Sequence, residues 1–396
     1  MKLYILAILF FVIPALHAQA EAYVFPLDAL HTLLTNDVKA IIDKNINDKQ
    51  TVFLGEAVHY SGSDFLAKAE FVKYLVSEHG YRDIAFESDF FALSFDHDKK
   101  NLYKMWGASD QCRDLMDFLK MNHVTIWGFD NRMPTAFSQM EFTGRLSDFL
   151  RTVNLPVNEK FTELSKLLIK NEYASRGLLS KEDIEFLNKF TEGLLASEKV
   201  KADILWGQIL ASFKSTIELY TVRDDADDTR RITIRDKQMA LNLNFLVKQH
   251  PDKKFIVWSA NGHMSKCDYK YMKGMTMGAQ FQDMNPKTSY HIAFASIMMP
   301  PEKSEKSVLK AAKNKDNILS VIPSVKSNYF LDASGMVDDY PLLAAKKFEG
   351  ARLFNFKKDK IEILNHYDAL VFIAGGIEVC LNFKRLFYKD VLVISY

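Results

Sequence analysis

The sequence predicts an α/β fold in which a mostly parallel sheet is flanked by helices, with a helical insertion or cap. Short apolar runs typical of buried strands alternate with stretches whose apolar residues recur at helical spacing. Between the third and fourth of these runs, residues from about 139 to 228 carry Leu and Phe at helical spacing and little strand signal. The 396 residues include 48% hydrophobic and 26% charged residues, an ordinary globular composition for two domains or one large one.

The predicted strands are short and consist mainly of apolar residues. They lie at residues 51–55, 83–87, 124–130, 255–259, 291–296, 329–332 and 369–373. The predicted helices lie at residues 30–46, 64–79, 110–121 and 235–249. Gly80 directly follows the second of these helices and is expected to cap it.

These elements predict a division of the chain into three parts. Residues 1–20 are expected to be a signal peptide, residues 21–138 and 229–396 the α/β core, and residues 139–228 the helical cap or insertion. The charged sequence RDDADDTRR at 223–231 is expected to connect the insertion back to the core. The aromatic and apolar residues 383–396 are expected to form a final strand or a docked tail.

The first twenty residues have the pattern of a secretory signal peptide. A basic Met1-Lys2 start precedes an apolar run from Leu3 to Leu16, and small residues then suit cleavage after about Ala20. The run has about 14 residues, fewer than the roughly 20 that a membrane span needs, so an uncleaved anchor is the alternative interpretation. No second long apolar run follows, so no stable membrane span is expected after cleavage. The protein is therefore expected to be periplasmic or secreted.

The net charge gives no argument for nucleic-acid binding, and the cysteines give no evidence of function. Lys and Arg number 51 against 50 Asp and Glu, and no basic stripe is present, so nucleic acid is not expected as a partner. The three cysteines, Cys112, Cys267 and Cys380, cannot all pair within one chain, so at least one is unpaired or intermolecular. Their spacing does not resemble a zinc site.

Polar residues follow the first four predicted strands. They are Glu56 and His59, Glu87, Asp130, and Asn261 with His263. If the sheet is parallel, these strand ends share one edge, where ligands of open α/β sheets bind. Two carboxylates and two histidines at that edge could perform general acid–base chemistry.

Each of these residues also has a structural interpretation. Glu56 could stabilise a helix N-terminus, and His59 taken alone is more often a structural histidine. Glu87 follows three apolar residues of a buried strand, so it must be paired or must face a cleft. The same argument applies to Asp130, for which Arg132 is a candidate structural partner, and His263 could lie on a surface loop.

A series of motifs resembles the erythromycin esterase-like family. They are Leu54-Gly-Glu-Ala-Val-His59, Lys68-Ala-Glu70, Leu75-Val-Ser-Glu-His-Gly80, Ile84-Ala-Phe-Glu87, Trp127-Gly-Phe-Asp130, Asp236-Lys-Gln-Met-Ala-Leu-Asn242, Trp258-Ser-Ala-Asn-Gly-His263 and Tyr367-Asp-Ala-Leu-Val-Phe372. The motifs extend over about residues 50 to 373 in the family's order, which makes the resemblance specific.

The resemblance implies a hydrolase that needs no metal or other cofactor and acts on a small-molecule ester or lactone. The best-known members of the family open the lactone ring of macrolides. By resemblance, His59 is the base that activates water, Glu56 and Glu87 hold the site, and His263 is its second histidine. Lys68, Asp130 and Asn261 are expected to bind substrate or support the site. The family also implies a helical cap over the cleft, which residues 139–228 would form.

This chain departs from the family's motifs at three places. Ala260 stands where the family has the first histidine of the fourth-strand motif. Lys68 stands where an arginine is usual, which keeps the charge but loses a bidentate fork. Tyr60-Ser61 replaces a Gly-Thr pair.

Three hypotheses therefore stay open. The first is an exported ester or lactone hydrolase. The second is a catalytically weak homologue that binds a ligand, which the loss of a histidine at Ala260 makes credible. The third is a metal-dependent hydrolase, because Glu56, His59, Glu87 and His263 are residue types that bind metals.

Overall fold

The computed structural model describes residues 22–170, 178–222, 228–267, 269–272, 274–298 and 304–381. The predicted signal peptide and the predicted C-terminal strand or tail at 383–396 lie outside the described residues. Among the helices that are described, none is long and apolar enough to cross a membrane.

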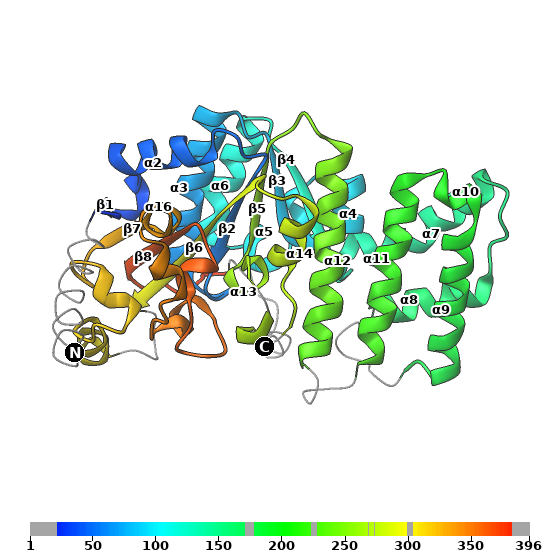
Figure 1. The fold of residues 1–396 in the computed structure, drawn as a ribbon. Helices are drawn as coiled ribbons and strands as arrows, with labels where there is room; N and C mark the ends of the chain where they lie inside the picture. The colour runs from blue at the N-terminus through cyan, green and yellow to red at the C-terminus, as the bar shows by residue number, and fades with distance from the viewer. Residues whose placement is uncertain are drawn as a thin grey trace.

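The described strands form one sheet of eight strands in the order β1-β7-β8-β6-β2-β5-β3-β4 (Figure 1). Their bounds are β1 Val24–Leu27, β2 Thr51–Glu56, β3 Asp83–Asp89, β4 Thr125–Asp130, β5 Phe255–Ala260, β6 Ser289–Met298, β7 Asn328–Asp332 and β8 Ala369–Gly375. All neighbouring strands from β8 to β4 are parallel, and only the pairs that involve β7 are antiparallel. The predicted α/β fold with a mostly parallel sheet is confirmed.

Strand β1 is an element that the sequence did not reveal. It has four residues, includes Pro26 and pairs only with β7 at the edge of the sheet. Proline is tolerated at an edge because one side of such a strand makes no ladder hydrogen bonds. So short an edge strand gives little hydrophobic pattern from which to predict it.

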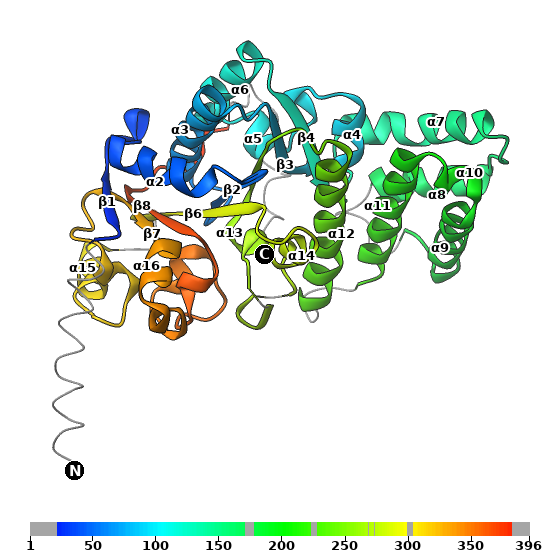
Figure 2. The same cartoon turned by 45° about the horizontal axis from the view of Figure 1, so that its top comes forward.

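Alternate residues of the central strands pack on opposite faces of the sheet. In β2, Val52 and Leu54 join one core cluster, whereas Phe53 joins the other. In β5, Ile256 and Trp258 likewise face the first cluster and Val257 the second. Helices α2 (Asn36–Ile46), α3 (Gly62–His79) and α6 (Asp110–Met121) cover the first face (Figure 2). Helices α12 (Asp228–Gln249), α14 (Met277–Met284) and α16 (Ala333–Asp339) lie against the other. Because both faces are covered, these strands are apolar throughout.

The helices agree with the predictions except near their N-termini. Their bounds are α2 Asn36–Ile46, α3 Gly62–His79, α4 Phe90–Phe95, α5 Lys104–Gly107, α6 Asp110–Met121, α7 Ala136–Thr152, α8 Glu159–Lys170, α9 Lys181–Ala196, α10 Glu198–Lys201, α11 Ile204–Thr221, α12 Asp228–Gln249, α13 Asn261–Met264, α14 Met277–Met284, α15 Glu305–Ala312 and α16 Ala333–Asp339. Gly80 ends α3 at φ 70°, in the left-handed conformation that glycine tolerates best.

Two predicted helix starts were wrong. The predicted helix at 30–46 is interrupted, because Leu30–Thr32 forms a separate 3₁₀ turn and the Thr35 side chain caps α2 by accepting from the Val38 N–H. The predicted connector at 223–231 is partly helical, because α12 already begins at Asp228. Residues 223–227 lie outside the described residues.

Helices α7 to α11 lie beyond the β4 end of the sheet, with α12 between them and the strands (Figure 1). The buried side chain of Asn242 joins these parts. Its Nδ2 donates to the Phe129 carbonyl of β4 at 3.0 Å and to Ser212 Oγ of α11 at 3.1 Å. Its Oδ1 accepts from the amide of Gln208 at 2.7 Å. These bonds hold α11 and α12 against the end of β4.

Candidate active site

The strand order brings the predicted site residues to one edge. Strands β2, β5, β3 and β4 are adjacent and parallel, so their carboxyl ends meet there. Glu56 ends β2, Glu87 lies near the end of β3, and Asp130 ends β4. All three carboxylates are buried. Buried carboxylates need partners, and the structure supplies a cation or a histidine to each.

Glu56 joins His59 and Lys68. Its Oε1 lies 3.0 Å from His59 Nδ1, and its Oε2 accepts from Lys68 Nζ. Because a carboxylate only accepts, Nδ1 of a neutral His59 carries the proton and Nε2 is left as a proton acceptor. The side chain of His59 is 24% exposed. Its imidazole packs in a T-shaped arrangement with the Trp106 ring, and the two ring centroids lie 5.8 Å apart. His59 is thus both oriented by a carboxylate and open to solvent.

Lys68 is fully buried on α3. Besides Glu56, its Nζ donates to the Ser259 carbonyl at 3.2 Å and lies 3.9 Å from the centre of the Trp258 ring. Burial lowers the pKa of Lys68, and the neighbouring charge of Glu56 opposes that shift. The carboxylate and the indole face together stabilise an ammonium group that water does not reach.

The turn that carries His59 is held by Asp64. The Ser61 N–H donates to the Val58 carbonyl at 3.0 Å and closes a turn around His59. Asp64 Oδ2 accepts from the Ala57 N–H at 3.1 Å, and its Oδ1 accepts from Ser296 Oγ at 2.7 Å. Burial raises the pKa of Asp64 to about 6, although these donors oppose the shift.

Glu87 forms the second centre of the site. Its Oε1 accepts from Arg235 Nη2 at 2.7 Å, and its Oε2 accepts from Ser259 Oγ at 2.9 Å and from the Ala260 N–H at 3.1 Å. Burial alone would raise the pKa of Glu87, but the charges of His263, Arg235 and His59 lower it well below its usual range. Glu87 is therefore ionised and fixed in place.

Arg235 bridges Glu87 and Asp130. Its Nε and Nη2 donate to the two carboxylate oxygens of Asp130 at 3.2 and 2.6 Å, and Tyr103 Oη donates to the same group at 2.8 Å. Arg132, the partner expected for Asp130, contributes its backbone N–H at 3.2 Å. The bidentate ion pair instead comes from Arg235, which lies 105 residues away in the chain.

His263 forms a second carboxylate–histidine pair with Asp236. Its Nδ1 lies 2.8 Å from Asp236 Oδ1, and its Nε2 lies 3.0 Å from Arg235 Nη1 and 3.4 Å from Glu87 Oε1. Burial lowers the pKa of His263, but Asp236 and Glu87 outweigh it and raise the pKa above the usual value. The imidazole is 16% exposed. A guanidinium only donates, so His263 Nε2 accepts from Arg235 Nη1 and the Nδ1 proton faces Asp236. Arg235 therefore brings positive charge to the same edge as His59.

Asn261 is buried and bonds to neighbouring parts of the sheet. The Asn261 side chain is buried, and its Nδ2 donates to the Phe294 carbonyl of β6 at 2.8 Å. The backbone carbonyl of Asn261 accepts from Tyr367 Oη at 2.9 Å. Gly55 makes room for this side chain, because a Cβ there would lie 2.4 Å from Asn261 Oδ1. These contacts join the end of β5 to the middle of β6 and to the segment before β8.

Sequence reasoning did not identify Arg235, Asp236 or Asp64 as site residues. Arg235 and Asp236 lie in the N-terminal half of α12, where nothing local distinguishes them from surface charges. Asp236 opens a motif that resembles the family, which was the available signal. Asp64 reads as an ordinary acidic residue in the first turn of a helix.

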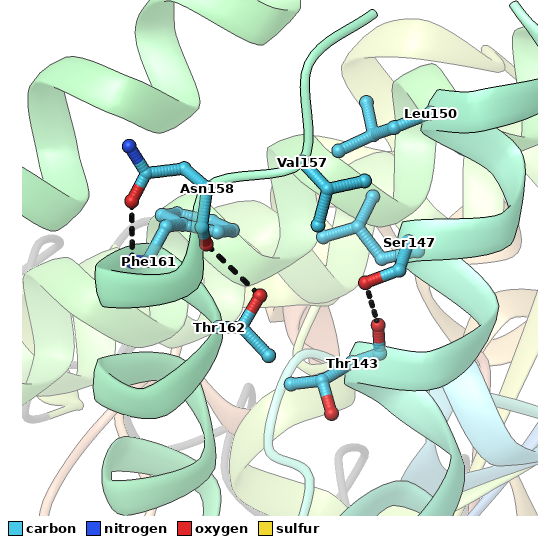
Figure 3. Close-up of a pocket in the computed structure, with 8 residues that line it drawn as sticks. Thr143, Ser147, Leu150, Val157, Asn158, Phe161 and Thr162 are labelled. Carbon is cyan, nitrogen blue, oxygen red and sulfur yellow. Dashed lines mark hydrogen bonds between the residues drawn. The ribbon is translucent and has the colours of Figure 1, made fainter.

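Within the described residues, no group of three or more His, Cys, Asp and Glu side chains is placed to hold a metal ion. A small pocket lies between α7 and α8 in the helical insertion (Figure 3). Its polar groups bond within their own helices, as Ser147 Oγ does to the Thr143 carbonyl at 2.8 Å, and its lining contains no titratable side chain.

The cysteines take no part in the site's hydrogen bonds. Cys112 is buried, Cys267 is half-buried and Cys380 is exposed, and no disulfide joins them. Burial raises the pKa of the Cys112 thiol to about 12, so this group is a thiol and not a nucleophile at neutral pH.

Known proteins share this fold. A Bacillus cereus protein of known structure superposes with a TM-score of 0.65 at 18% identity, covering 91% of this chain and 97% of that chain. A succinoglycan biosynthesis protein superposes with a TM-score of 0.67 at 15% identity, covering 92% and 98%. The erythromycin esterase EreC, solved as a mutant in its open conformation, gives 0.67 at 15%, covering 90% and 98%.

Sequence comparison identifies the family. The Bacillus subtilis (strain 168) protein YbfO, whose name describes it as a candidate hydrolase, is 25% identical over 357 residues, covering 74% of this chain and 78% of that protein. The family described as erythromycin esterase matches residues 76–298, more than half of the chain. The chain belongs to the erythromycin esterase family of ester hydrolases.

Proposed function

We propose that this protein hydrolyses an ester or lactone bond of a small molecule and that His59 is the base that activates the water. The observation that supports this proposal is the Glu56–His59 pair. A buried carboxylate bonds Nδ1 at 3.0 Å, which leaves Nε2 on a partly exposed imidazole to accept a proton.

The proposed reaction is direct attack by water. His59 Nε2 takes a proton from water while the water oxygen bonds to the ester carbonyl carbon, which forms a tetrahedral oxyanion. The carbon–oxygen bond to the leaving group then breaks, and the departing alkoxide receives a proton from the His59 imidazolium. Glu56 stabilises that imidazolium, as the carboxylate partner of a catalytic histidine does.

Arg235 and His263 are the proposed electrostatic partners of this reaction. The guanidinium lies 2.7 Å from Glu87 and contacts His263, and these groups are 15% and 16% exposed. Positive charge placed beside a developing oxyanion stabilises the transition state more than the neutral substrate. Fixed carboxylates around Arg235 keep that charge in place before substrate binds.

Apolar side chains beside His59 indicate the kind of substrate. Val58 and Tyr60 are 41% and 45% exposed although both are large and apolar or aromatic. Exposed apolar groups at a binding edge favour ligands with an apolar part. We propose an ester whose acyl or alcohol group is apolar. In the wild-type protein, p-nitrophenyl esters with longer acyl chains should have a lower KM. In Tyr60→Ser, lengthening the acyl chain should no longer lower KM.

The reaction proposed here uses only groups of this chain. Glu56 already pairs with Lys68, and Glu87 with Arg235, so the carboxylates that would be metal ligands are engaged by internal cations. Metal independence is therefore part of the proposal, and activity should survive a chelator. Loss of activity with EDTA and its return with a divalent cation would support the metal-dependent hypothesis instead.

The loss of the first histidine of the fourth-strand motif favours one alternative. Ala260 is buried, and its side chain offers no proton donor beside Glu87. A chain without that histidine could bind its ligand and turn it over slowly. In that case a ligand would bind in calorimetry while hydrolysis stays at the rate of His59→Ala.

The deciding experiment compares the wild-type protein with His59→Ala and with His31→Ala, whose imidazole is exposed on a 3₁₀ turn outside the site. Each would be assayed on p-nitrophenyl esters, simple lactones and erythromycin, with and without chelator. Hydrolysis that is lost only in His59→Ala is the expected result. Equal turnover by all three proteins would remove His59 as the base.

We also propose that the chain is exported to the periplasm or the medium. The basic start, the apolar run of about 14 residues and the small residues before Glu21 support cleavage after Ala20. Expression of the full sequence followed by fractionation and N-terminal sequencing tests the proposal. A mature N-terminus at Glu21 is expected, and an uncleaved Met1 in the cytoplasm would refute it.

A further inference from the structure

The segment after β8 returns to the site. Residues 376–381, which we name the C-terminal strap, follow the last strand of the described chain. The strap makes antiparallel bridges at two places, Glu378 with Ser61 and Leu381 with Ser109. These partners cap the N-termini of α3 and α6. The strap therefore crosses the starts of two helices that lie far from it in the sequence.

The strap bonds the turn that carries His59. The Gly62 N–H donates to the Ile377 carbonyl at 2.7 Å, and the Val379 N–H donates to the Tyr60 carbonyl at 2.9 Å. The Ile377 N–H donates to Ser63 Oγ at 2.7 Å. Tyr60 is the residue directly after His59, so one of these bonds lies one residue from the proposed base.

Gly62 shows how closely the strap lies on this turn. A Cβ at position 62 would meet the Ile377 and Glu378 carbonyl oxygens at 3.0 Å each and Gln111 Cγ at 3.1 Å. Its φ is not in the left-handed region, so the lack of a side chain serves the close approach of the strap. The contact is thus a packed one as well as a hydrogen-bonded one.

The far end of the strap is fixed to α6. The Asp110 N–H donates to the Cys380 carbonyl at 2.9 Å. Gln111 bonds the strap twice, because its Nε2 donates to the Glu378 carbonyl at 3.2 Å and its Oε1 accepts from the Cys380 N–H at 3.0 Å. Since α6 packs against α3, the strap is attached to a rigid part of the core.

We propose that the C-terminal strap is a positioning element for His59, an inference that rests on the proposed role of His59 as base. Asp64 holds the turn upstream of His59 at Ala57, and the strap holds it downstream at Tyr60 and Gly62. The imidazole lies between these two anchors and contacts Glu56 only through Nδ1. Catalytic geometry is lost when a general base shifts by about 1 Å, so the downstream anchor sets the rate.

The test removes one backbone donor of the strap in the full chain. Val379→Pro deletes the N–H that bonds Tyr60. Glu378→Pro is the matched control, because the Glu378 N–H has no hydrogen-bond partner among the described residues and the side chain is exposed. Gln111→Ala releases the far end of the strap without altering its sequence. Neither control nor variant changes a residue of the catalytic machinery.

Two measurements decide the inference. Val379→Pro should lower kcat on a p-nitrophenyl ester by roughly five- to tenfold with KM unchanged, the effect of about one lost hydrogen bond. Hydrogen exchange at residues 58–63 should become faster in the same protein. Gln111→Ala should also lower kcat and speed hydrogen exchange at residues 58–63, but less than Val379→Pro does. Glu378→Pro should match the wild type in both measurements.

The outcomes separate the strap from the proposed function. Unchanged exchange at residues 58–63 in Val379→Pro and Gln111→Ala would overturn the strap's hold on the turn. Faster exchange with unchanged kcat would overturn its positioning role. If the wild type hydrolyses nothing, the proposed function fails, and hydrogen exchange still shows whether the strap orders the turn. If Val379→Pro does not fold, Gln111→Ala gives both measurements.

Discussion

Replacing Lys68 with methionine tests the buried ion pair on which the His59 centre depends. Lys68 and Glu56 have no exposed side-chain surface, so Lys68→Met leaves Glu56 buried with the His59 imidazole as its remaining side-chain partner among the described residues. Removing one partner of a buried pair costs about 3–5 kcal/mol, because the remaining charge is uncompensated. Methionine nearly preserves the volume of the lysine stem, so a cavity adds little to this cost.

The assay is urea denaturation at pH 7 together with ester hydrolysis. Lys68→Met should lose about 3–5 kcal/mol of unfolding free energy. The kcat should fall at least about tenfold, because Glu56 without the cation that fixes its Oε2 no longer holds His59 in one orientation. Lys73→Met is the control on the same helix. Lys73 bonds Glu70 at 2.8 Å but is 36% exposed, so its loss should cost less than about 1 kcal/mol.

A double variant separates the charge from the packing. In Glu56→Gln/Lys68→Met no uncompensated charge stays buried, so part of the stability lost in Lys68→Met should return. Activity should not return, since Glu56 is absent. If Lys68→Met and Lys73→Met each lose less than about 1 kcal/mol of unfolding free energy, the argument that Lys68 and Glu56 are energetically coupled is refuted.

Three further predictions concern other residues. Burial raises the pKa of Asp64 from 3.8 to about 6, so its contribution to stability is complete below about pH 4 and is lost as pH rises through about 6, a change of about 3 kcal/mol. Asp64→Asn should therefore flatten the stability profile over that window in denaturation at pH 4 and pH 7, and an unchanged slope would contradict it. Gly128→Ala should destabilise the protein by more than about 2 kcal/mol, because the new Cβ would lie 2.5 Å from the Asp89 carbonyl oxygen. Gly193→Ala in α9 should stabilise it by about 1 kcal/mol, because a Cβ there meets nothing within 4 Å. Equal melting temperatures of the two variants would be evidence against this. Glu87 has a pKa held below its usual range, so its contribution is present above about pH 4.5 and is lost on acidification; in Glu87→Gln the loss of stability below pH 4 should be smaller than in the wild type, as acid titration followed by circular dichroism would show.

The sequence was sufficient to predict seven of the eight described strands and the edge of the sheet at which four of the candidate site residues meet. Buried strands have local signatures, and parallel strands bring their carboxyl ends together, which placed Glu56, Glu87, Asp130 and His263 at one edge. The partners of these groups were not predictable in the same way. Arg235 reaches Asp130 across 105 residues, and nothing in its neighbourhood along the chain encodes that contact.

The errors in the fold have local physical causes. The predicted helix at 30–46 follows a continuous apolar pattern, but the Thr35 side chain offers the backbone a cap that starts α2 later. Strand β1 is stabilised by pairing with β7, more than 300 residues away, so its four residues carry little signal of their own. The strap was missed for the same reason, since its partners lie at residues 60–63 and 109–111.

The position of β5 has a consequence for synthesis of the protein on the ribosome. This strand fills the space between β2 and β3, yet it follows them in the chain by more than 150 residues. Until residues 255–260 leave the ribosome, β2 and β3 cannot be joined, and the facing edges of both strands lack their hydrogen-bond partner. Strand β6, the other neighbour of β2, also follows the insertion in the chain. A nascent chain that stalls within the helical insertion thus leaves both edges of β2 and one edge of β3 unpaired, and unpaired edges of this kind promote aggregation.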